Sequence, residues 1–229
     1  MFTYDHLSIT QATQLQKELA SQIRLTPLEK PIEIIAGADI SYNKFSTTVY
    51  AGIVLIRYQD MKPFAYSLVE TEVKFPYVSG YLAFREIPAV KMAWEQLPQK
   101  PDLIIMDGQG ITHPRKMGIA SHFGLVENVP AIGCAKTMLY GDFAPLAPEK
   151  GSVSPIIAKG EKLGYALRTR DQVKPVYVSP GHLITIDQAL EVMKNCIGKY
   201  RIPEPTRHAH NLVNEFRRGE VSAGFHLLP

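Results

Sequence analysis

The spacing of apolar residues predicts three consecutive strands in the first third of the chain. Stretches rich in isoleucine, valine and tyrosine cover residues 32–42, 47–58 and 64–75. Residues of these types favour the pleated backbone of a sheet. The linkers between the three stretches are short, which predicts antiparallel hairpins.

Helical spacing of apolar residues appears on both sides of these strands. A helix is predicted over residues 10–25, with Thr10 as its N-cap and Ala12, Leu15, Leu19 and Ile23 on one face. A second helix follows residue 80. Pro88 predicts a kink or a fresh start inside it, because proline cannot donate a backbone hydrogen bond. Its apolar face contains Ala83, Ile87, Val90, Trp94 and Leu97.

The second half of the chain alternates between strands and helices. The segments PDLIIMDGQG, MGIASHFGLVEN and AIGCAK predict strand, helix and strand, an order that implies parallel pairing. A proline-rich loop over residues 144–155 precedes two strand-like segments, GYALRTR and KPVYVSPGH. One helix then begins at a capping box, Thr185 with Gln188, and a last helix has Pro205 near its start. The pattern predicts one α/β domain over residues 1–229, with a mixed sheet (antiparallel meander plus parallel strands) flanked by helices.

Composition restricts the class of protein. Of 229 residues, 45% are hydrophobic and 21% charged, which suits a folded core and excludes a mostly disordered chain. No apolar run approaches the roughly 20 residues of a membrane span. The start, MFTYDHLSIT, lacks the pattern of a signal peptide, so a cytoplasmic protein is expected. Cys134 and Cys196 are far apart and are expected to be reduced core thiols.

A formal net charge of +3 is too small to establish a nucleic-acid partner. It permits a polyanion if the positive charges cluster. Local clusters occur in HPRKMG, in KNCIGKYR and at Arg217–Arg218. Solvated surface is the alternative interpretation of each cluster.

Three carboxylates stand out as candidate metal ligands. Asp39 lies in the apolar strand IIAGADIS, and Asp107 ends LIIMD. Each taken alone is also explained as a turn cap. If the two strands are neighbours, however, the two carboxylates converge, and a docked helix can bring Glu86 to the same corner. Like charges held together raise one another's pKa, so a cation is expected among them. Hard oxygen ligands suit Mg²⁺ or Mn²⁺.

Several long motifs between about residue 30 and about residue 213 resemble the endonuclease V family. They are GADISY, FPYVSGYLAFREIP, PDLIIMDGQGITHPRKMGIASHFGL, IGCAK, VSPGH and RIPEPTRHAH, in the family order. The resemblance implies an RNase H-like fold and a metal-dependent nuclease that recognises deoxyinosine in DNA. It further implies a nick at the second phosphodiester bond 3′ to the lesion, leaving 3′-hydroxyl and 5′-phosphate.

The resemblance also assigns catalytic roles. It makes Asp39, Glu86 and Asp107 the ligands of Mg²⁺, for which Mn²⁺ can substitute, and it places His210 near the metal. His208 competes for that role, but on a helix the two histidines lie about 200° apart, so only one faces the site. Lys136, at the end of IGCAK, either extends outward to solvent or contacts phosphate, and the resemblance favours phosphate.

The segment PYVSG resembles the family's strand-separating wedge, in which Tyr77 stacks at the lesion. Pro76 and Gly80 stiffen and turn this tip, whereas Ser79 replaces the usual proline and predicts a more flexible tip. The alternative is that Tyr77 is a core aromatic at a strand end. The resemblance further predicts a base pocket lined by Leu82, Gly108, His113, Gly118, Ile119 and Leu139, which is expected to use backbone groups more than side chains.

Some alternatives remain open from the sequence. His113 is also explained as a loop residue, and His122 as a core histidine. Two other functions fit the same fold: a protein that binds nucleic acid without cutting it, and a ribonuclease directed at inosine in RNA. DNA containing deoxyinosine is the expected partner, RNA is the alternative, and the protein is expected to be a monomer.

Overall fold

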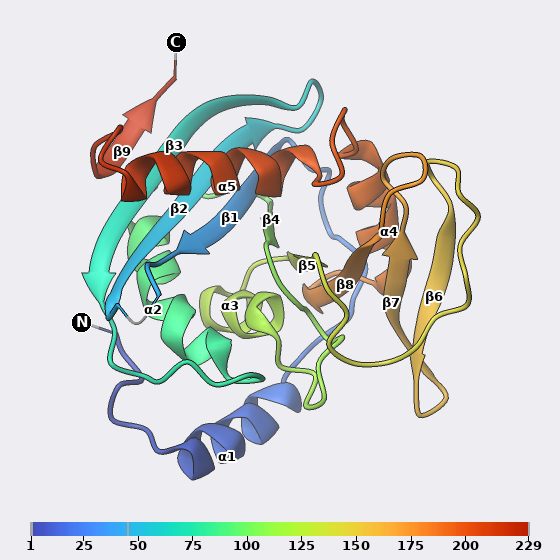
Figure 1. The fold of residues 1–229 in the computed structure, drawn as a ribbon, viewed down its shortest axis with the longest axis horizontal. Helices are drawn as coiled ribbons and strands as arrows, with labels where there is room; N and C mark the ends of the chain where they lie inside the picture. The colour runs from blue at the N-terminus through green and yellow to red at the C-terminus, as the bar shows by residue number, and fades with distance from the viewer. Residues whose placement is uncertain (1, 45, 229) are drawn as a thin grey trace.

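A mixed sheet lies at the centre of the computed structural model, which describes residues 2–44 and 46–228 (Figure 1). Within these residues the strand order is β6-β7-β8-β5-β4-β1-β2-β3-β9. Both β1 with β4 and β4 with β5 pair in parallel, and the other neighbours are antiparallel. The predicted mixed sheet is confirmed. The strands are β1 (Ile34–Ser41), β2 (Thr48–Arg57), β3 (Lys62–Glu72), β4 (Leu103–Met106), β5 (Ala131–Ala135), β6 (Val153–Ala158), β7 (Glu161–Leu167), β8 (Val176–His182) and β9 (Gly224–Leu227).

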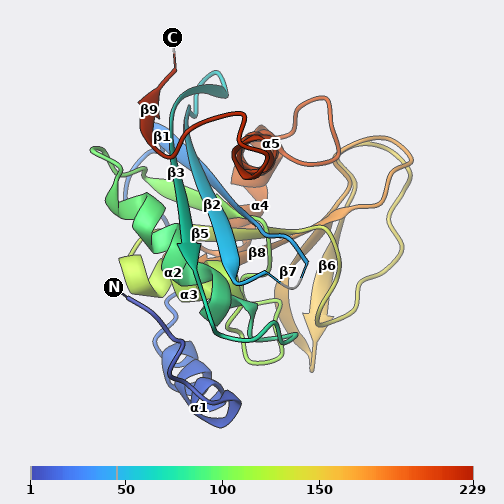
Figure 2. The same cartoon turned by 60° about the vertical axis from the view of Figure 1, so that its left-hand side comes forward.

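Helices cover both faces of the sheet, as Figure 2 shows for α5 and α2. On one face α2 (Leu82–Glu95) packs on β2 and β3, and α3 (Ile119–Glu127) packs on β5 and β8. On the other face α5 (Glu204–Arg217) crosses β1 and β2, and α4 (Ile186–Asn195) lies on β7 and β8. The remaining helix, α1 (Ile9–Ala20), contacts α3 from outside.

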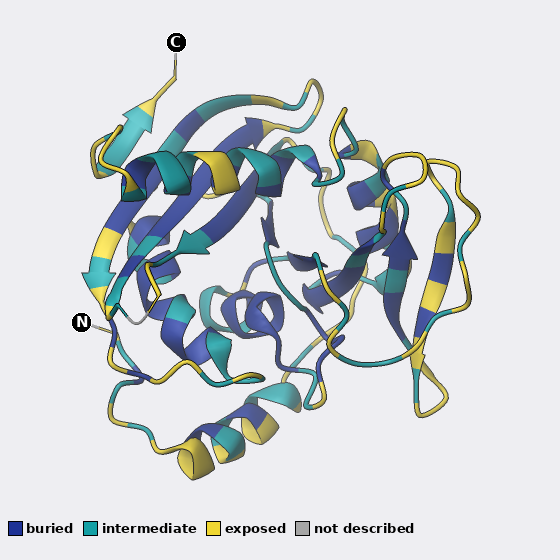
Figure 3. Ribbon diagram, viewed as in Figure 1, coloured by how far each residue is buried: buried dark blue, intermediate teal, exposed yellow. Residues whose placement is uncertain are grey.

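The central strands are buried on both faces, which explains their continuous apolar sequences (Figure 3). In β4, Ile104 and Met106 join the core beneath α2 and α3, while Leu103 and Ile105 join the core beneath α4 and α5. The alternation therefore divides each central strand between two apolar layers.

Two predicted helix features are corrected or resolved by the structure. The first helix is shorter than predicted, and Ser8, not Thr10, is its N-cap: Ser8 Oγ accepts from the Gln11 amide, and the Gln11 side chain accepts from the Ser8 amide. Ile23 lies beyond the end of this helix. The second helix continues through Pro88 without restarting.

The predictions missed the two edge strands, β6 and β9. β6 overlaps the predicted proline-rich loop and contains Pro155, which an edge strand tolerates because one side makes no ladder bonds. β9 is only four residues long and is held by pairing with β3, a contact that sequence spacing does not reveal.

Candidate active site

Parallel pairing of β1 and β4 brings two acidic residues to the same edge of the sheet. Ala38 is in register with Met106, and the amide of Asp107 donates to the Ala38 carbonyl at 3.1 Å. Asp39 and Asp107 are the next residues along the two strands. The sequence predicted that the two carboxylates would converge if their strands were neighbours, and β1 and β4 are neighbours in the sheet.

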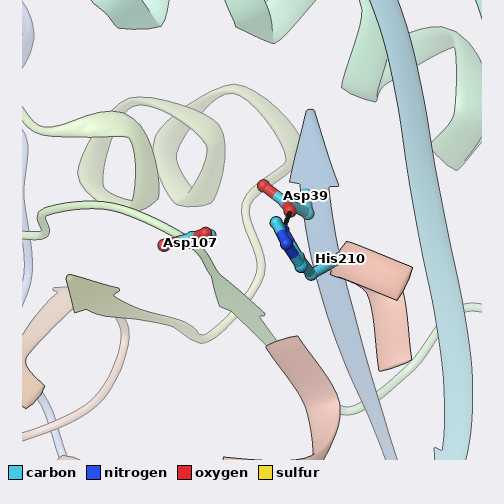
Figure 4. Close-up of side chains that lie close together, drawn as sticks. All are labelled: Asp39, Asp107 and His210. Atoms are coloured by element: carbon cyan, nitrogen blue, oxygen red, sulfur yellow. Dashed lines mark hydrogen bonds and ion pairs between the residues drawn. The ribbon is translucent and has the colours of Figure 1, made fainter. Parts of the chain in front are cut away.

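A close approach of α5 to β1 adds His210 to the two carboxylates. A Cβ at Gly37 would lie 1.9 Å from the Pro205 carbonyl oxygen, so only glycine lets the helix pack this tightly. His210 Nδ1 then lies 2.7 Å from Asp39 Oδ2 (Figure 4). Ligand atoms of Asp39, Asp107 and His210 all lie within 4.8 Å of one another.

Glu86 comes from α2, on the opposite face of the sheet. Burial, followed by the negative charges of Asp39 and Asp107, raises the pKa of Glu86 to about 8, against the opposing charge of Arg85. Burial also raises the pKa of Asp107, together with the charge of Asp39 and against that of Lys136. The three carboxyl groups therefore influence one another, although Glu86 does not join the tight cluster of Asp39, Asp107 and His210.

Lys136 follows β5 and forms an ion pair with Asp107. Burial alone would lower its pKa, but the adjacent carboxylates of Asp107 and Asp39 raise it. Arg201 Nη2 donates to the Lys136 carbonyl at 2.7 Å and so fixes the backbone at this point. Lys136 is partly exposed and faces the carboxylates rather than extending into solvent.

The donor set fits a divalent cation. Carboxylate oxygens from two strands and one helix, with an imidazole beside them, are gathered where burial disfavours negative charge. Without a cation, the positive charges of Lys136 and Arg85 offset part of this negative charge, and the raised pKa values favour partial protonation. Oxygen-rich sites of this kind suit Mg²⁺ or Mn²⁺.

A cavity of about 400 Å³ opens beside the carboxylates and is called here the carboxylate pocket. Glu86, Asp107 and Lys136 lie in its wall. Every residue that the sequence suggested for substrate binding also lines it: Tyr77 and Gly80 of the wedge, and Leu82, Gly108, His113, Gly118, Ile119 and Leu139 of the base pocket. Its size falls in the range of small-ligand sites.

The aromatic tip at the rim of this pocket is a tight turn. Tyr81 N–H donates to the Val78 carbonyl at 3.0 Å, and Gly80 has φ +80°. These are features of a type II turn with Ser79 and Gly80 at its centre, where glycine is favoured. Tyr77, with 62% of its surface exposed, projects beside this turn rather than entering the core.

Three side chains converge on the Gly80 carbonyl oxygen. Gln16 Nε2 donates at 2.9 Å, Arg115 Nη2 at 2.9 Å and His113 Nε2 lies at 3.1 Å. Arg115 also donates to the Gln16 side chain, and its guanidinium lies over the Tyr81 ring. The turn is therefore held from α1 and from the loop before α3.

The contacts of His113 indicate a neutral ring with its proton on Nε2. Its Nδ1 accepts from the Arg115 amide at 3.2 Å, so Nε2–H is the donor to Gly80. Burial lowers the pKa of His113 to about 4, and the charge of Arg115 acts in the same direction. His113 lines the pocket while both of its ring nitrogens are already engaged.

Other candidate residues lie elsewhere. His208 is half-buried against Glu204 of its own helix, at 3.3 Å, away from the carboxylates. His122 is a core histidine that contacts Tyr4 Oη at 2.7 Å. Cys134 and Cys196 are buried and free, as expected.

The sequence analysis missed Gln16 and Arg115. Gln16 is fully buried and lies four residues after Ala12, on the apolar face of α1, so a polar residue at that spacing was the available signal. Arg115 belongs to the basic cluster HPRKMG, which gave no indication of its partner.

Comparison with known proteins identifies the family. The family model described as Endonuclease V matches residues 17–211, most of the chain. An Endonuclease V of Myxococcus xanthus is 47% identical over 215 residues, which cover 93% of this chain and 92% of that protein. This chain belongs to the Endonuclease V family.

Solved Endonuclease V structures share the fold. That of Streptomyces avermitilis has a TM-score of 0.88 at 36% identity and covers 96% of this chain and 97% of its own. Ciona intestinalis Endonuclease V, in complex with a 24mer DNA containing an inosine followed by a ribo-adenosine, has a TM-score of 0.81 at 29% identity, with 93% and 99% covered. The fold class predicted from the sequence is thereby confirmed.

Membership of the Endonuclease V family makes this chain an enzyme, a nuclease that hydrolyses phosphodiester bonds. Endonuclease V enzymes in general depend on metal, and Asp39, Asp107 and His210 form a candidate site in this one. Across residues 2–44 and 46–228, the helices are too short or too polar to cross a bilayer.

Proposed function

We propose that this Endonuclease V is a DNA repair enzyme that recognises deoxyinosine, the product of adenine deamination. It nicks the second phosphodiester bond 3′ to the lesion and leaves 3′-hydroxyl and 5′-phosphate. The observation that carries the proposal is the adjacency of the carboxylate pocket to the Asp39, Asp107 and His210 cluster, with Tyr77 exposed at the rim. This combination supplies a place for a base, a place for a phosphate and a ring that can separate strands.

Asp39, Asp107 and Glu86 would hold a divalent cation, Mg²⁺ or in its place Mn²⁺. When bound, this ion supplies positive charge at the scissile phosphate and makes water a better nucleophile at neutral pH. His210 hydrogen-bonds Asp39 and fixes the direction of its carboxylate. Lys136 lies beside Asp107 and adds a positive charge for a phosphate oxygen.

The hydrolysis moves few groups. A water oxygen bonds to phosphorus, the bond from phosphorus to the 3′ oxygen breaks, and one proton of the water ends, net, on the departing 3′ oxygen. His210, partly exposed next to Asp39, is placed either to orient the water or to assist at the leaving oxygen.

Backbone geometry shapes the base pocket. The amides of Gly118 and Ala120 donate to the carbonyls of Gly110 and Gln109, at 3.1 and 3.0 Å, and so fix the wall at the start of α3. Hypoxanthine presents O6 as an acceptor where adenine presents an amino donor. An adenine in a site built for the acceptor leaves polar groups unpaired, at a cost of about 1–3 kcal/mol.

Tyr77 acts as the wedge. Stacking of one base on an aromatic ring contributes roughly 1–3 kcal/mol, close to the cost of unstacking a damaged base. The tip and Glu86 lie on one continuous segment, in which the turn leads directly into α2. The segment therefore sets the distance between the sensed base and the cut.

The choice of nucleic acid is part of the proposal. The inosine-containing DNA bound by the Ciona relative supports deoxyinosine DNA as the substrate. Inosine in RNA remains the second candidate, because that oligonucleotide carried a ribonucleotide after the inosine. A cytoplasmic, monomeric enzyme is the expected form.

End-labelled oligonucleotides test the proposal. A strand with one deoxyinosine and its twin with deoxyadenosine are incubated with protein and Mg²⁺, and the products are sized and their ends determined. We expect cutting of the inosine strand alone, at the second bond 3′ to the lesion. A matched RNA strand measures the preference between sugars. Binding without cleavage in Mg²⁺ or Mn²⁺ would instead establish the non-cleaving alternative.

A further inference from the structure

A second cavity lies next to the aromatic tip. It has a volume of about 610 Å³ and is called here the Tyr42 cavity. It is lined by Tyr42, Lys44, Ser46, Thr47, Tyr77 and Arg85. Tyr77 is the residue that this cavity shares with the carboxylate pocket.

Contacts with Tyr42 and Arg85 hold the wall of the Tyr42 cavity in place. The rings of Tyr42 and Tyr77 meet edge to face with centroids 6.0 Å apart. The Arg85 guanidinium lies 5.4 Å from the centre of the Tyr42 ring. Arg85 also donates to the carbonyls of Ser46, at 2.6 Å, and Phe75, at 2.9 Å. One buried arginine therefore links the β1–β2 loop to the base of the tip.

The lining suits an unpaired nucleotide. Two tyrosine rings offer faces and edges for stacking, the hydroxyls of Ser46 and Thr47 offer hydrogen bonds, and Lys44 and Arg85 make the lining positively charged. A purine or pyrimidine fits within this volume. The carboxylate pocket combines a base site with acidic groups, whereas the Tyr42 cavity has none in its described lining.

We propose that the Tyr42 cavity receives the base of the complementary strand that loses its partner when the lesion leaves the duplex. This inference rests on the proposed function. A ring that enters a duplex at a base pair separates two bases, and Tyr77 lines two cavities. The carboxylate pocket takes the lesion, since the scissile phosphate of the same strand must reach Asp39 and Asp107. The Tyr42 cavity, the other cavity that Tyr77 lines, is therefore the site for the opposite base.

The surroundings of the cavity support a second strand on this side. Asn43, in the same loop, accepts from Arg217 of α5 at 2.6 Å, so the basic end of α5 lies next to the cavity. Arg217, the basic residue in the last turn of α5, places positive charge near the cavity, where a complementary backbone would continue.

The fluorescent base 2-aminopurine, placed opposite deoxyinosine in a duplex, tests the proposal. Binding is measured without Mg²⁺, so that the strand stays intact. Stacking quenches 2-aminopurine, and we expect it to remain quenched in complexes of the wild type and of Tyr42→Phe, which keeps the ring. In complexes of Tyr42→Ala the probe should be several-fold brighter. Thr47→Phe, which fills the cavity and leaves Tyr42 in place, should also brighten it.

Cleavage provides a second measurement. For Tyr42→Ala, we expect kcat/KM on the inosine duplex to fall about tenfold more than on the inosine single strand, because only the duplex has an opposite base. Tyr165→Ala is the matched control, at a partly buried tyrosine of β7 whose hydroxyl donates to Asp187 of α4. It should change neither the duplex-to-single-strand ratio of kcat/KM nor the 2-aminopurine fluorescence. Thermal denaturation checks that each variant is folded.

Two results would overturn the proposal. One is equal 2-aminopurine fluorescence in the wild-type and Tyr42→Ala complexes. The other is brightening only when the probe sits 5′ to the inosine on the lesion strand, which would assign the cavity to that strand. If the wild type failed to cut even the inosine single strand in Mg²⁺, the proposed function itself would be wrong. That outcome is distinguishable from the two fluorescence results, which concern the Tyr42 cavity alone.

Discussion

The side-chain amide of Gln16 donates a 2.9 Å hydrogen bond to the carbonyl oxygen of Gly80 and so joins α1 to the turn that follows Tyr77. The two residues are 64 positions apart in the chain. Gln16 is fully buried, and its Oε1 accepts a hydrogen bond from Arg115 Nε. Arg115 Nη2 in turn donates to the Gly80 carbonyl. The rigidity of the aromatic tip therefore depends on a helix to which none of the pocket-lining residues belongs among the described residues.

Replacing Gln16 by leucine should loosen the tip. The substitution leaves Arg115 Nε without its acceptor in a part-buried site, although Nη2 keeps the Gly80 carbonyl. This loss costs about 1–3 kcal/mol and lowers Tm by about 2–12 °C. Cleavage of inosine duplex should fall more than cleavage of single strand, because only the duplex requires the wedge. Gln14→Leu on the same helix is the control, since Gln14 is exposed and pairs only with Glu18 among the described contacts. Equal losses on the two substrates would contradict this role.

Ser79→Pro should stiffen the turn. Ser79 occupies the second position of a turn with type II features, where the φ of proline fits, and proline reduces the freedom of the unfolded chain. We expect a gain of about 0.4–1 kcal/mol in the free energy of unfolding and faster duplex cleavage. Gly80→Ala should act in the opposite direction, because φ +80° strains any residue with a Cβ. Denaturant titration of both variants measures the difference.

Asp39→Asn and Asp107→Asn should each abolish cleavage while the protein stays folded. Each removes one negative charge from a buried group of like charges, so the metal-free protein should not lose stability. Mg²⁺ should raise Tm of the wild type but not that of either variant, since a ligand stabilises only the state that binds it. Wild-type turnover by either variant would exclude these ligands.

Acid should destabilise the protein through His122. Burial lowers the pKa of this histidine to about 4, below its ordinary value of 6.5, so the unfolded chain binds the extra proton first. Its contribution is fully present above pH 6.5 and is lost as the pH falls toward 4. At pH 5 the loss is about 2 kcal/mol relative to pH 7.

Unfolding free energies of His122→Phe at pH 7 and pH 5 check this value. The variant should lose less stability between the two pH values than the wild type does. His113 and His182 have similarly lowered pKa values, so they account for the pH dependence of stability that remains in the variant. An unchanged slope in the variant would mean that His122 does not titrate differently on folding.

Local information in the sequence predicted the central part of the fold. The apolar strands before and after Asp39 and Asp107 are continuous because both faces of the sheet are covered, and the segment order implied antiparallel hairpins followed by a parallel pair. The edge strands β6 and β9 escaped prediction, since edge pairing leaves little periodic signal. Ser8 rather than Thr10 caps α1, through two reciprocal hydrogen bonds with Gln11.

The sequence by itself determined which chemical groups are present: three carboxylates, a histidine, a lysine and an aromatic turn, in an order that resembles Endonuclease V. Only the tertiary structure decided which of them meet. The register of β1 with β4 aligns Asp39 with Asp107, and the lack of a Cβ at Gly37 lets α5 bring His210 to Asp39. The contact of Gln16 with Gly80 and the cavity beside Tyr42 likewise join segments far apart in the chain. Side-chain chemistry is a local property, whereas proximity depends on how all the layers pack.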